Sequence, residues 1–273
     1  MINQRVNRIE YLNLGCGYRY NQQWTNVNFT ATGKEVIAYD LLKKIPFADN
    51  TFEVVYHSHL LEHIPKDRAQ SFITECYRVL QPGGIIRVVV PDLEQIARVY
   101  LESIKQADKS EQGAANHEWM TLELLDQLVR DRRGGDMAAY LAKEKIHNRE
   151  FVTQRFGQEA KRVWQTKQQP SSNMLKQFKK AIANYELLPK SLNRLFKAIQ
   201  IGYYRQNGEV HQWMYDRYSL SVLLKNCGFE NIVRRTASES YIPNWDSFNL
   251  DTEPDGSIYK PDSLFVEAIK PDY

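Results

Sequence analysis

Short apolar runs alternate with polar turns over the first part of the chain. Glycine, aspartate or proline follows directly at positions 15, 40 and 91, a pattern typical of buried strands that end in tight turns. Residues 66–80 differ, because their apolar side chains recur every three or four positions, which predicts an amphipathic helix. Pro82, Gly83 and Gly84 are expected to end this helix. The strands predicted in this part are residues 11–14, 25–29, 35–39, 53–57 and 86–90.

The pattern changes after Asp92. Residues 92–200 are almost entirely helical in periodicity, with breaks at residues 134–135 and 170–172. This stretch is much longer than one crossover between strands requires. It therefore predicts a helical insert or lid.

The sheet pattern resumes near the end of the chain. Ser219 is the predicted N-cap of a further helix, and Gly228 stands where a helix commonly ends. Residues 229–234 and 264–269 follow as the last two strands. The alternation of strands and helices predicts the α/β class, with a doubly wound parallel sheet. The predicted domains are residues 1–92 and 211–273 for the sheet and residues 93–210 for the insert.

The composition, the apolar runs and the cysteine positions limit the classes of protein to which the chain can belong. With 273 residues, of which 42% are hydrophobic and 25% charged, the chain can bury a substantial core. No apolar run approaches the length of a bilayer-spanning helix, and residues 1–10 lack the apolar centre of a signal peptide. Cys16, Cys76 and Cys227 are too scattered for a disulfide framework or a zinc site. We therefore expect reduced cysteines and a cytoplasmic protein.

Positive charge is concentrated in the insert. Residues 141–210 hold 14 Lys and Arg against 5 Asp and Glu, a net charge of +9, whereas the rest holds 22 against 28, a net charge of −6. Two basic amphipathic helices are predicted there, one around Lys176, Lys179 and Lys180 and one around residues 192–199. Such helices suit an acidic or phosphorylated acceptor, a peripheral contact with an anionic membrane, or a lid with solvated lysines. Nucleic acid is less favoured, because no recognised nucleic-acid motif accompanies them.

The first strand ends in two glycines one residue apart. Gly15, Cys16 and Gly17 follow Leu14, and the lack of side chains at the glycines lets a ligand lie against the backbone. In open α/β sheets ligands bind beyond the carboxyl ends of the strands, which is where this loop falls. Taken alone, such a loop also fits a nucleotide binder or a plain turn.

Four further segments follow the glycine loop in order. They are residues 40–42, 45–52, 61–64 and 78–84. The whole series resembles the class I S-adenosylmethionine-dependent methyltransferases, most closely their small-molecule branch. The resemblance implies a Rossmann-like sheet of seven strands with an antiparallel last strand, and S-adenosylmethionine as cofactor. The short connection after Gly17 and the late segment at residues 213–217 also resemble predicted methyltransferases of bacterial polysaccharide and glycan loci.

The resemblance also assigns a cofactor site. In the family an acidic residue at the end of the second strand holds the ribose hydroxyls, and here Asn28 stands there without the charge that strengthens such contacts. Asp40 matches the position near the adenine amino group, with the backbone of Leu41 beside the ring. Arg19 replaces the usual third glycine. The implied cofactor-binding residues are Leu14, Gly15, Cys16, Gly17, Asn28, Asp40, Leu41, His57 and Ser58.

Histidines follow the fourth predicted strand. Methyl transfer from a sulfonium is an in-line displacement, and a hydroxyl acceptor also needs a base for its proton. Histidine has the pKa range for this work at neutral pH. His59, His63 and His211 are therefore the candidate catalytic residues, and the expected reaction is O-methylation of a sugar or glycan precursor.

Two other functions stay open from the sequence. His59, Glu62 and His63, with His211 far along the chain, resemble the metal cluster of the small-RNA 3′-end 2′-O-methyltransferases, although that family has a glutamate where His59 stands. Asn28 and the missing third glycine suit a methyltransferase-fold protein that serves in binding or assembly without transferring a methyl group. The favoured prediction involves no metal.

Overall fold

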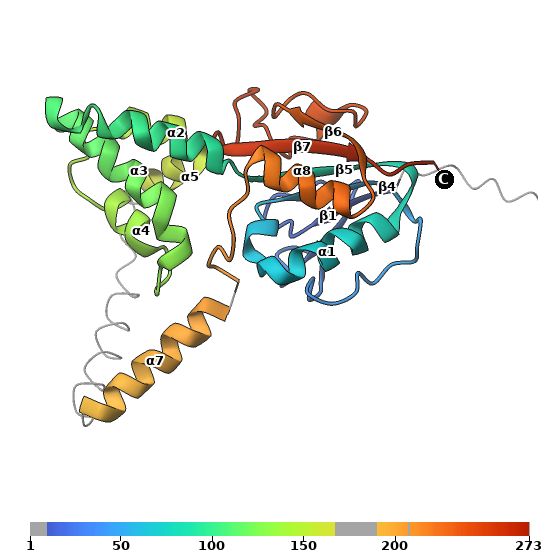
Figure 1. Ribbon diagram of the computed structural model, residues 1–273, viewed down its shortest axis with the longest axis horizontal. Helices are drawn as coiled ribbons and strands as arrows, with labels where there is room; N and C mark the ends of the chain where they lie inside the picture. Colours follow the sequence, from blue (N-terminus) through green and yellow to red (C-terminus); the bar gives the residue numbers. More distant parts are fainter. Residues whose placement is uncertain (1–9, 167–189, 207, 273) are drawn as a thin grey trace, which may run out of the picture. The chain divides into compact units, whose positions relative to one another are not determined.

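The computed structural model describes residues 10–166, 190–206 and 208–272. They form two compact units, a sheet unit from Met1–Ile96 with Gln212–Tyr273 and a helical unit from Ala97–His211 (Figure 1). The predicted domain boundaries remain a prediction, because a compact unit is not by itself shown to fold alone. Among the described residues, none of the helices has the length and apolar character needed to cross a bilayer.

The sheet unit contains seven strands in the order β3-β2-β1-β4-β5-β7-β6. Pairings among β1 to β5 are parallel, and β7 runs antiparallel to both of its neighbours. This arrangement confirms the predicted α/β class and the antiparallel last strand. The strands are β1 (Tyr11–Leu14), β2 (Thr25–Asn28), β3 (Val36–Ala38), β4 (Phe52–Ser58), β5 (Leu80–Pro91), β6 (Glu230–Arg235) and β7 (Ser263–Ile269).

Strand β5 begins earlier than the sequence predicts. Helix α1 (Lys66–Val79) is followed directly by Leu80, which has an extended backbone and pairs with Phe52. Gly83 takes a φ of +74°, which a glycine adopts without strain, so the chain continues as a strand through Pro-Gly-Gly. The pairing with β4 shifts register between Phe52 and Val54. The proline and glycines therefore form an irregularity inside the strand and do not precede it.

Helices α1 and α8 (Arg217–Asn226) cover one face of the sheet (Figure 1). The end of α8 is as predicted, because Gly228 follows the C-cap with a φ of +93°. Its start differs. Asp216 is the N-cap, and its carboxylate accepts a hydrogen bond from the Ser219 N–H while the Ser219 hydroxyl accepts one from the Asp216 N–H. Ser219 is thus the third helical residue of a capping box, because the N-cap position is occupied by Asp216, whose carboxylate accepts the hydrogen bond.

The opposite face is covered by chain that contains little helix. The connection from β1 to β2 spans residues 15–24 without a helix, as the sequence predicts from its shortness. Residues around the 3-10 helix η3 (Trp245–Phe248) pack on this face instead. The rings of Trp24 and Phe248 lie 5.2 Å apart, and those of Tyr56 and Trp245 lie 5.3 Å apart.

Two buried asparagines hold the short connection in place. The Asn13 amide donates to the Asn26 side-chain oxygen at 3.2 Å and to the Arg19 carbonyl at 3.3 Å. The Asn26 amide donates to the carbonyls of Asn21 and Trp24, both at 2.8 Å. These bonds satisfy loop carbonyls that would otherwise be buried without partners. Parallel pairing of β1 and β2 is therefore maintained without a crossover helix.

A buried ion cluster joins β5, β7 and the late loops. The Arg87 guanidinium lies 2.8 Å from the Asp251 carboxylate and 2.7 Å from that of Glu267, and all three side chains are almost fully buried. The Tyr56 hydroxyl donates to Asp251 at 2.6 Å. The remaining Arg87 N–H groups donate to the carbonyls of residues 236, 237 and 239. All polar groups of this cluster thus have partners, which is the condition under which buried charge is tolerated.

The helical unit has its own core. Trp119 is fully buried, lies near the rings of Tyr140 and Phe156, and donates its indole N–H to Glu123 at 3.0 Å. The Arg155 guanidinium also binds Glu123. The break predicted at residues 134–135 is confirmed between α3 and α4. The helices are α2 (Leu93–Ile104), which starts in the sheet unit, η2 (Ala107–Lys109), α3 (Glu111–Val129), α4 (Gly135–Leu141), α5 (Arg149–Thr166) and α7 (Lys190–Gln206). The predicted break at 170–172 and Lys176, Lys179 and Lys180 lie outside the described residues.

Candidate active site at the carboxyl edge of the sheet

The glycine loop leaves the sheet where the strand order reverses, between β1 and β4. Leu14 pairs with His57 across this boundary. The N–H groups of Gly15 and Cys16 donate to the Val27 carbonyl at 2.8 and 3.2 Å, so they are bound to β2. The loop therefore lies at the edge that open α/β sheets use for ligands.

The two glycines differ in the space beside them. A side chain at Gly15 would meet Leu60, whose methyl carbons lie 2.9 Å from the position of the added carbon. At Gly17 no atom lies within 4 Å of that position, and its φ of +53° favours glycine. Cys16 is buried, and burial raises the pKa of its thiol to about 11. The thiol is thus protonated at neutral pH, and the open side of the loop is at Gly17.

Asn28 and Asp40 both engage the backbone around the loop. The Asn28 side-chain oxygen accepts from the Gly17 N–H at 3.4 Å, and its amide donates to the Thr30 carbonyl at 3.0 Å. One Asp40 oxygen accepts from the Leu42 N–H at 3.0 Å, and the other lies 3.8 Å from the Lys43 ammonium. Asp40 keeps lone pairs for a further donor, because a carboxylate has about four acceptor positions.

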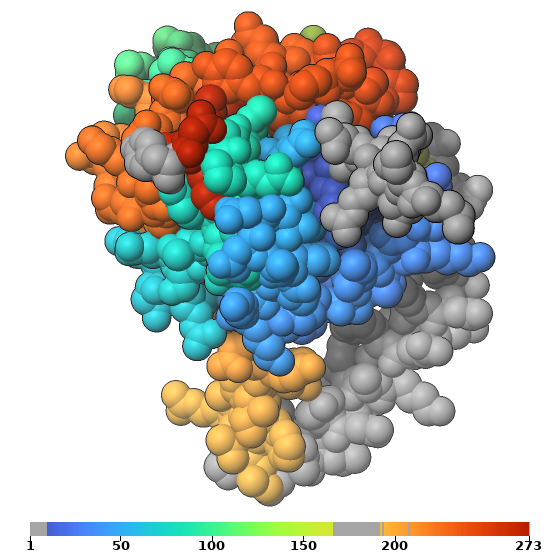
Figure 2. All heavy atoms as spheres, turned by 90° about the vertical axis from the view of Figure 1, so that its right-hand side faces the viewer, coloured from blue at the N-terminus to red at the C-terminus, as the bar shows by residue number. Residues whose placement is uncertain are grey.

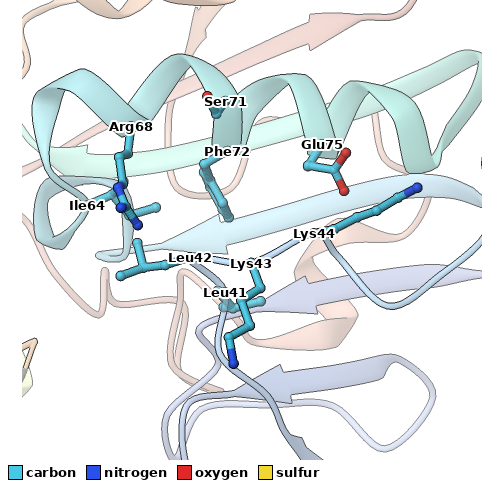
Figure 3. Close-up of a pocket in the computed structure, with 9 residues that line it drawn as sticks. All are labelled: Leu41, Leu42, Lys43, Lys44, Ile64, Arg68, Ser71, Phe72 and Glu75. Atoms are coloured by element: carbon cyan, nitrogen blue, oxygen red, sulfur yellow. The ribbon is translucent and has the colours of Figure 1, made fainter.

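A hollow of about 420 Å³ lies beside Asp40, between α1 and residues 41–44 (Figure 3). Figure 2 shows the same neighbourhood from outside, with residues near 45 in blue beside α1 in cyan. The side chains of Arg68 and Phe72 point from α1 toward residues 41–44. The lining residues are Leu41, Leu42, Lys43, Lys44, Ile64, Arg68, Ser71, Phe72 and Glu75. Apolar walls with a polar rim suit a ligand that carries a flat ring and polar substituents.

These residues fit S-adenosylmethionine at three points. Space is open beside Gly17, a carboxylate with spare lone pairs stands at Asp40, and the hollow begins at Leu41. Leu14 is fully buried, so it offers only its backbone, and Ser58 is half-buried at the end of β4. Arg19, in place of the third glycine, binds elsewhere. Its guanidinium donates to the Leu250 carbonyl at 2.7 Å and pairs with Glu253 at 2.9 Å.

His59 is held between two side chains just after β4. Its Nδ1 lies 3.1 Å from a Glu62 carboxylate oxygen, and its Nε2 lies 2.8 Å from the Ser263 hydroxyl oxygen. His59 has a positive φ of 50°, and its N–H donates to the Val89 carbonyl at 2.9 Å. Positive φ is uncommon outside glycine and often marks functional positions. The imidazole thus has one fixed orientation.

The neighbours of His59 favour one tautomer of its ring. An ionised carboxylate attracts a proton, so the Glu62 carboxylate, 3.1 Å from Nδ1, favours the tautomer with the proton on Nδ1, although the two groups are in ion-pair contact and not in hydrogen-bond geometry. Nε2 then presents a lone pair, which accepts from the Ser263 hydroxyl. This is the arrangement of a general base oriented by a carboxylate. The side chain of Glu62 is fully buried, whereas that of His59 keeps 12% exposure.

His57 is placed differently from the other predicted residues. It is fully buried, and its ring lies 5.3 Å from that of Phe72 on the α1 face of the sheet. Among the described residues neither ring nitrogen has a hydrogen-bond partner. Burial lowers the pKa of His57 to about 4, with Glu62 opposing this effect. The neutral ring is part of the core beneath the site, and its assignment to the cofactor remains a prediction.

His63 and His211 belong to different units. His63 ends the 3-10 helix η1 (Leu61–His63) in the sheet unit, where it is half-buried and its N–H donates to the Leu60 carbonyl at 3.0 Å. His211 is the last residue of the helical unit, where it is buried and its N–H donates to the Gln127 carbonyl at 3.0 Å. The structure therefore joins His59 to Glu62 within one unit, and roles for His63 and His211 stay predictions.

Ser263 is absent from the predicted site residues, and Glu62 appears only in the metal-cluster alternative. Ser263 pairs with Pro91 at the start of β7. An antiparallel strand begins at the edge where its parallel neighbours end, so a polar residue at its start is placed at the ligand edge. That signal was available in the sequence. The contact with His59 was not, because 204 positions separate the two residues.

Comparison with known families finds a match to part of the sheet unit. Residues 21–88, a quarter of the chain, match the family described as a methyltransferase domain. This segment of the sheet unit is therefore similar to a methyltransferase domain. The match supports the predicted methyltransferase fold over these residues, and S-adenosylmethionine is the cofactor that such a domain implies. It does not extend to the resemblance with polysaccharide loci, which stays a prediction.

Short segments of the chain also match curated proteins. One segment is 56% identical over 41 residues to a ubiquinone/menaquinone biosynthesis C-methyltransferase of Desulfotalea psychrophila, covering 15% of this chain and 16% of the relative. Another is 39% identical over 56 residues to a protein of Mycolicibacterium smegmatis named probable S-adenosylmethionine-dependent methyltransferase, covering 20% and 21%. The matches thus span about a fifth or less of each relative.

Solved structures are similar only distantly. A methyltransferase of Archaeoglobus fulgidus, described as dependent on S-adenosylmethionine, is 12% identical with a TM-score of 0.38, over 96% of this chain and 86% of that chain. A similarity this weak assigns no activity.

Proposed function

We propose that this chain is an S-adenosylmethionine-dependent methyltransferase that methylates a small acceptor, with His59 as its base. The observation that carries this proposal is the orientation of His59 by Glu62 and Ser263 at the carboxyl end of β4. The methyltransferase domain supplies the reaction class. The preceding strand pairs with the strand that leads into the glycine loop, so the base and the cofactor edge lie on neighbouring strands.

The cofactor would be held by the loop and by the ends of the next two strands. S-adenosylmethionine, when bound, supplies a methyl group on a positively charged sulfur. The open side of Gly17 gives its backbone room to approach the ligand. Asp40 accepts hydrogen bonds, and Leu41 offers an apolar wall of the hollow. Asn28 would act indirectly, because its side-chain oxygen accepts a hydrogen bond from the Gly17 N–H.

The acceptor proton would go to Nε2 of His59. That nitrogen is the acceptor in the tautomer favoured by Glu62, and the buried carboxylate would stabilise the positive charge that the ring gains. The acceptor hydroxyl would take the place of the Ser263 hydroxyl at Nε2, or lie beside it. His59 would then release the proton to solvent through its exposed edge.

We propose a hydroxyl of a sugar or glycan precursor as the acceptor. The support for this acceptor comes from the surroundings of Trp213. The backbone N–H of Trp213 donates to the Glu62 carbonyl at 3.2 Å. Trp213 is 38% exposed, and the Lys66 ammonium lies 3.8 Å from its ring centroid. An indole with an exposed apolar face and a polar edge suits a molecule of mixed character such as a sugar.

The test begins with calorimetry and ends with methyl transfer. Wild type should bind S-adenosylhomocysteine, and labelled S-adenosylmethionine should label a component of a glycan extract. His59→Gln should lose about two orders of magnitude or more in turnover with unchanged cofactor affinity. His147→Gln, at a half-exposed histidine of the helical unit, is the matched control.

Three outcomes would count against parts of this proposal. No binding at millimolar S-adenosylhomocysteine would favour a binding or assembly protein. Labelling of quinone precursors in place of glycans would overturn the acceptor. Activity lost with a chelator and restored by Mg²⁺ or Mn²⁺ would favour a metal-dependent RNA methyltransferase.

A further inference from the structure

Helix α7 of the helical unit exposes a continuous apolar stripe. Five large side chains are 43% to 76% exposed, which is unusual for neighbouring apolar residues. Their spacing of 3, 4, 7 and 11 positions from the first places them on one face of the helix. They are Leu192, Leu195, Phe196, Ile199 and Tyr203.

The opposite face of α7 is basic. Arg194 and Lys197 are exposed, and helical spacing places them away from the apolar stripe. Residues 190–206 contain four Lys and Arg and no Asp or Glu. Scattered surface charge usually mixes both signs, so a single-sign helix indicates an acidic counterpart.

The end of α7 is attached to the rest of the helical unit. The Arg205 guanidinium donates to the carbonyls of Leu128 and Arg130 at the end of α3, at 3.2 and 3.4 Å. These bonds use the carbonyls that a helix end leaves unpaired. The exposed stripe ends close to this attachment, at Tyr203. The helix is therefore anchored at one end, and its apolar face is exposed among the described residues.

We propose that α7 lies in the surface of an anionic membrane, with its apolar stripe among the acyl chains and its basic residues among the headgroups. A helix of 17 residues with this polarity is suited to the interface, since it is not apolar enough to cross. The net charge of +9 in residues 141–210 adds attraction to anionic lipid. The proposal is independent of the methyl-transfer function.

The direct test is sedimentation of the full chain with vesicles. Vesicles of phosphatidylcholine with phosphatidylglycerol should carry the protein down, and vesicles of phosphatidylcholine alone should carry at least tenfold less. Bound protein should be released as salt is raised, because the attraction is partly electrostatic. Equal binding to both vesicles, or none to either, would overturn the proposal.

Matched variants separate the stripe from general surface character. Leu195→Gln with Phe196→Gln should lower vesicle binding about tenfold or more, with the same helical circular dichroism as wild type. Leu101→Gln is the control, because Leu101 is 58% exposed on α2 and Leu195 is 56% exposed. If the control lowers binding as much as the stripe variant, α7 is not the docking element.

A charge pair completes the test. Arg194→Glu with Lys197→Glu should weaken binding to the anionic vesicles, whereas Lys145→Glu with Lys161→Glu, at exposed positions elsewhere in the unit, should change it less. If wild type is instead a dimer without vesicles, and the stripe variant is a monomer, a second copy of the chain covers the stripe and the membrane proposal is wrong.

Discussion

The fully buried carboxylate of Glu62 lies 3.1 Å from Nδ1 of His59, three residues earlier in the chain. The pair spans the turn from β4 into η1, so local backbone geometry sets its distance. The carboxylate has little access to water, so its interaction with a positively charged ring is weakly screened. In the proposed reaction Glu62 is therefore a positioning residue, and the proton transfer itself belongs to His59.

Glu62→Gln should lower turnover at least about tenfold, less than the loss of roughly two orders or more from removing the base itself. Glutamine keeps the size of the side chain but not the negative charge that stabilises the protonated ring. The acceptor KM and the affinity for S-adenosylhomocysteine should stay near wild type. Steady-state kinetics and calorimetry check this together. A parallel loss of cofactor affinity would show that Glu62 is structural.

Asp40→Asn and Asp40→Ala should separate two roles of one side chain. Both should weaken binding of S-adenosylhomocysteine by about tenfold to a hundredfold, because a charged acceptor contributes roughly 1.5–3 kcal/mol. Asparagine keeps the acceptor for the Leu42 N–H, so only alanine should also lower the melting temperature. Asp49→Asn, at another exposed turn, is the control for binding. Equal affinity in wild type and both variants would remove Asp40 from the cofactor site.

Arg87→Met should destabilise the sheet unit by about 3–5 kcal/mol, because Asp251 and Glu267 would remain buried without their cation. Urea unfolding measures this. Arg235→Met is the matched control, since Arg235 pairs with the same Glu267 at 3.3 Å but is 22% exposed. Its loss should be about 1 kcal/mol or less. Similar losses in the two variants would mean that burial of the pair does not set the effect.

Stability should fall as the pH falls from about 6.5 to about 4, because of His57. Burial lowers its pKa to about 4 in the folded chain, against 6.5 when unfolded, so the unfolded chain binds the proton more strongly in this window. The free energy of unfolding should drop by up to about 1.4 kcal/mol per pH unit from this group. His57→Phe should flatten that slope, and His147→Gln should not. Unfolding in urea at several pH values checks it, and equal slopes in all three proteins would contradict it.

The local pattern of apolar positions predicted the helices and strands, because its periodicity depends only on residues close together in the chain. The helix expected at residues 66–80 is found at Lys66–Val79, and the glycine at 228 ends α8 as expected. The cap of α8 was misplaced because Asp216 and Ser219 are both good caps, and only the backbone conformation decides between them. Propensity alone does not rank two acceptors three residues apart.

Side-chain contacts between residues far apart in the chain could not be predicted from the sequence. Arg19 was identified as a departure from the family, but its binding to Glu253 joins residues 234 positions apart. The Arg87 cluster likewise depends on Asp251, 164 positions later. Nothing in the periodicity of one strand specifies such a partner. The residues 11–17 could be placed at the ligand edge because strand ends and glycine conformations are local properties, whereas the neighbours of His59 required the fold.

The placement of β7 beside β5 has a consequence for synthesis of the protein. On the side of β5 that faces β7, Val88 pairs with Val266, which is translated 178 residues later. At about 5–20 residues per second, the emerging half-sheet keeps one apolar strand edge unpaired for roughly 10 to 35 seconds. An open edge of that kind pairs readily with other chains. Yield in a cell should therefore depend on chaperones that shield nascent chains during this interval, and slower growth at low temperature should not by itself rescue it.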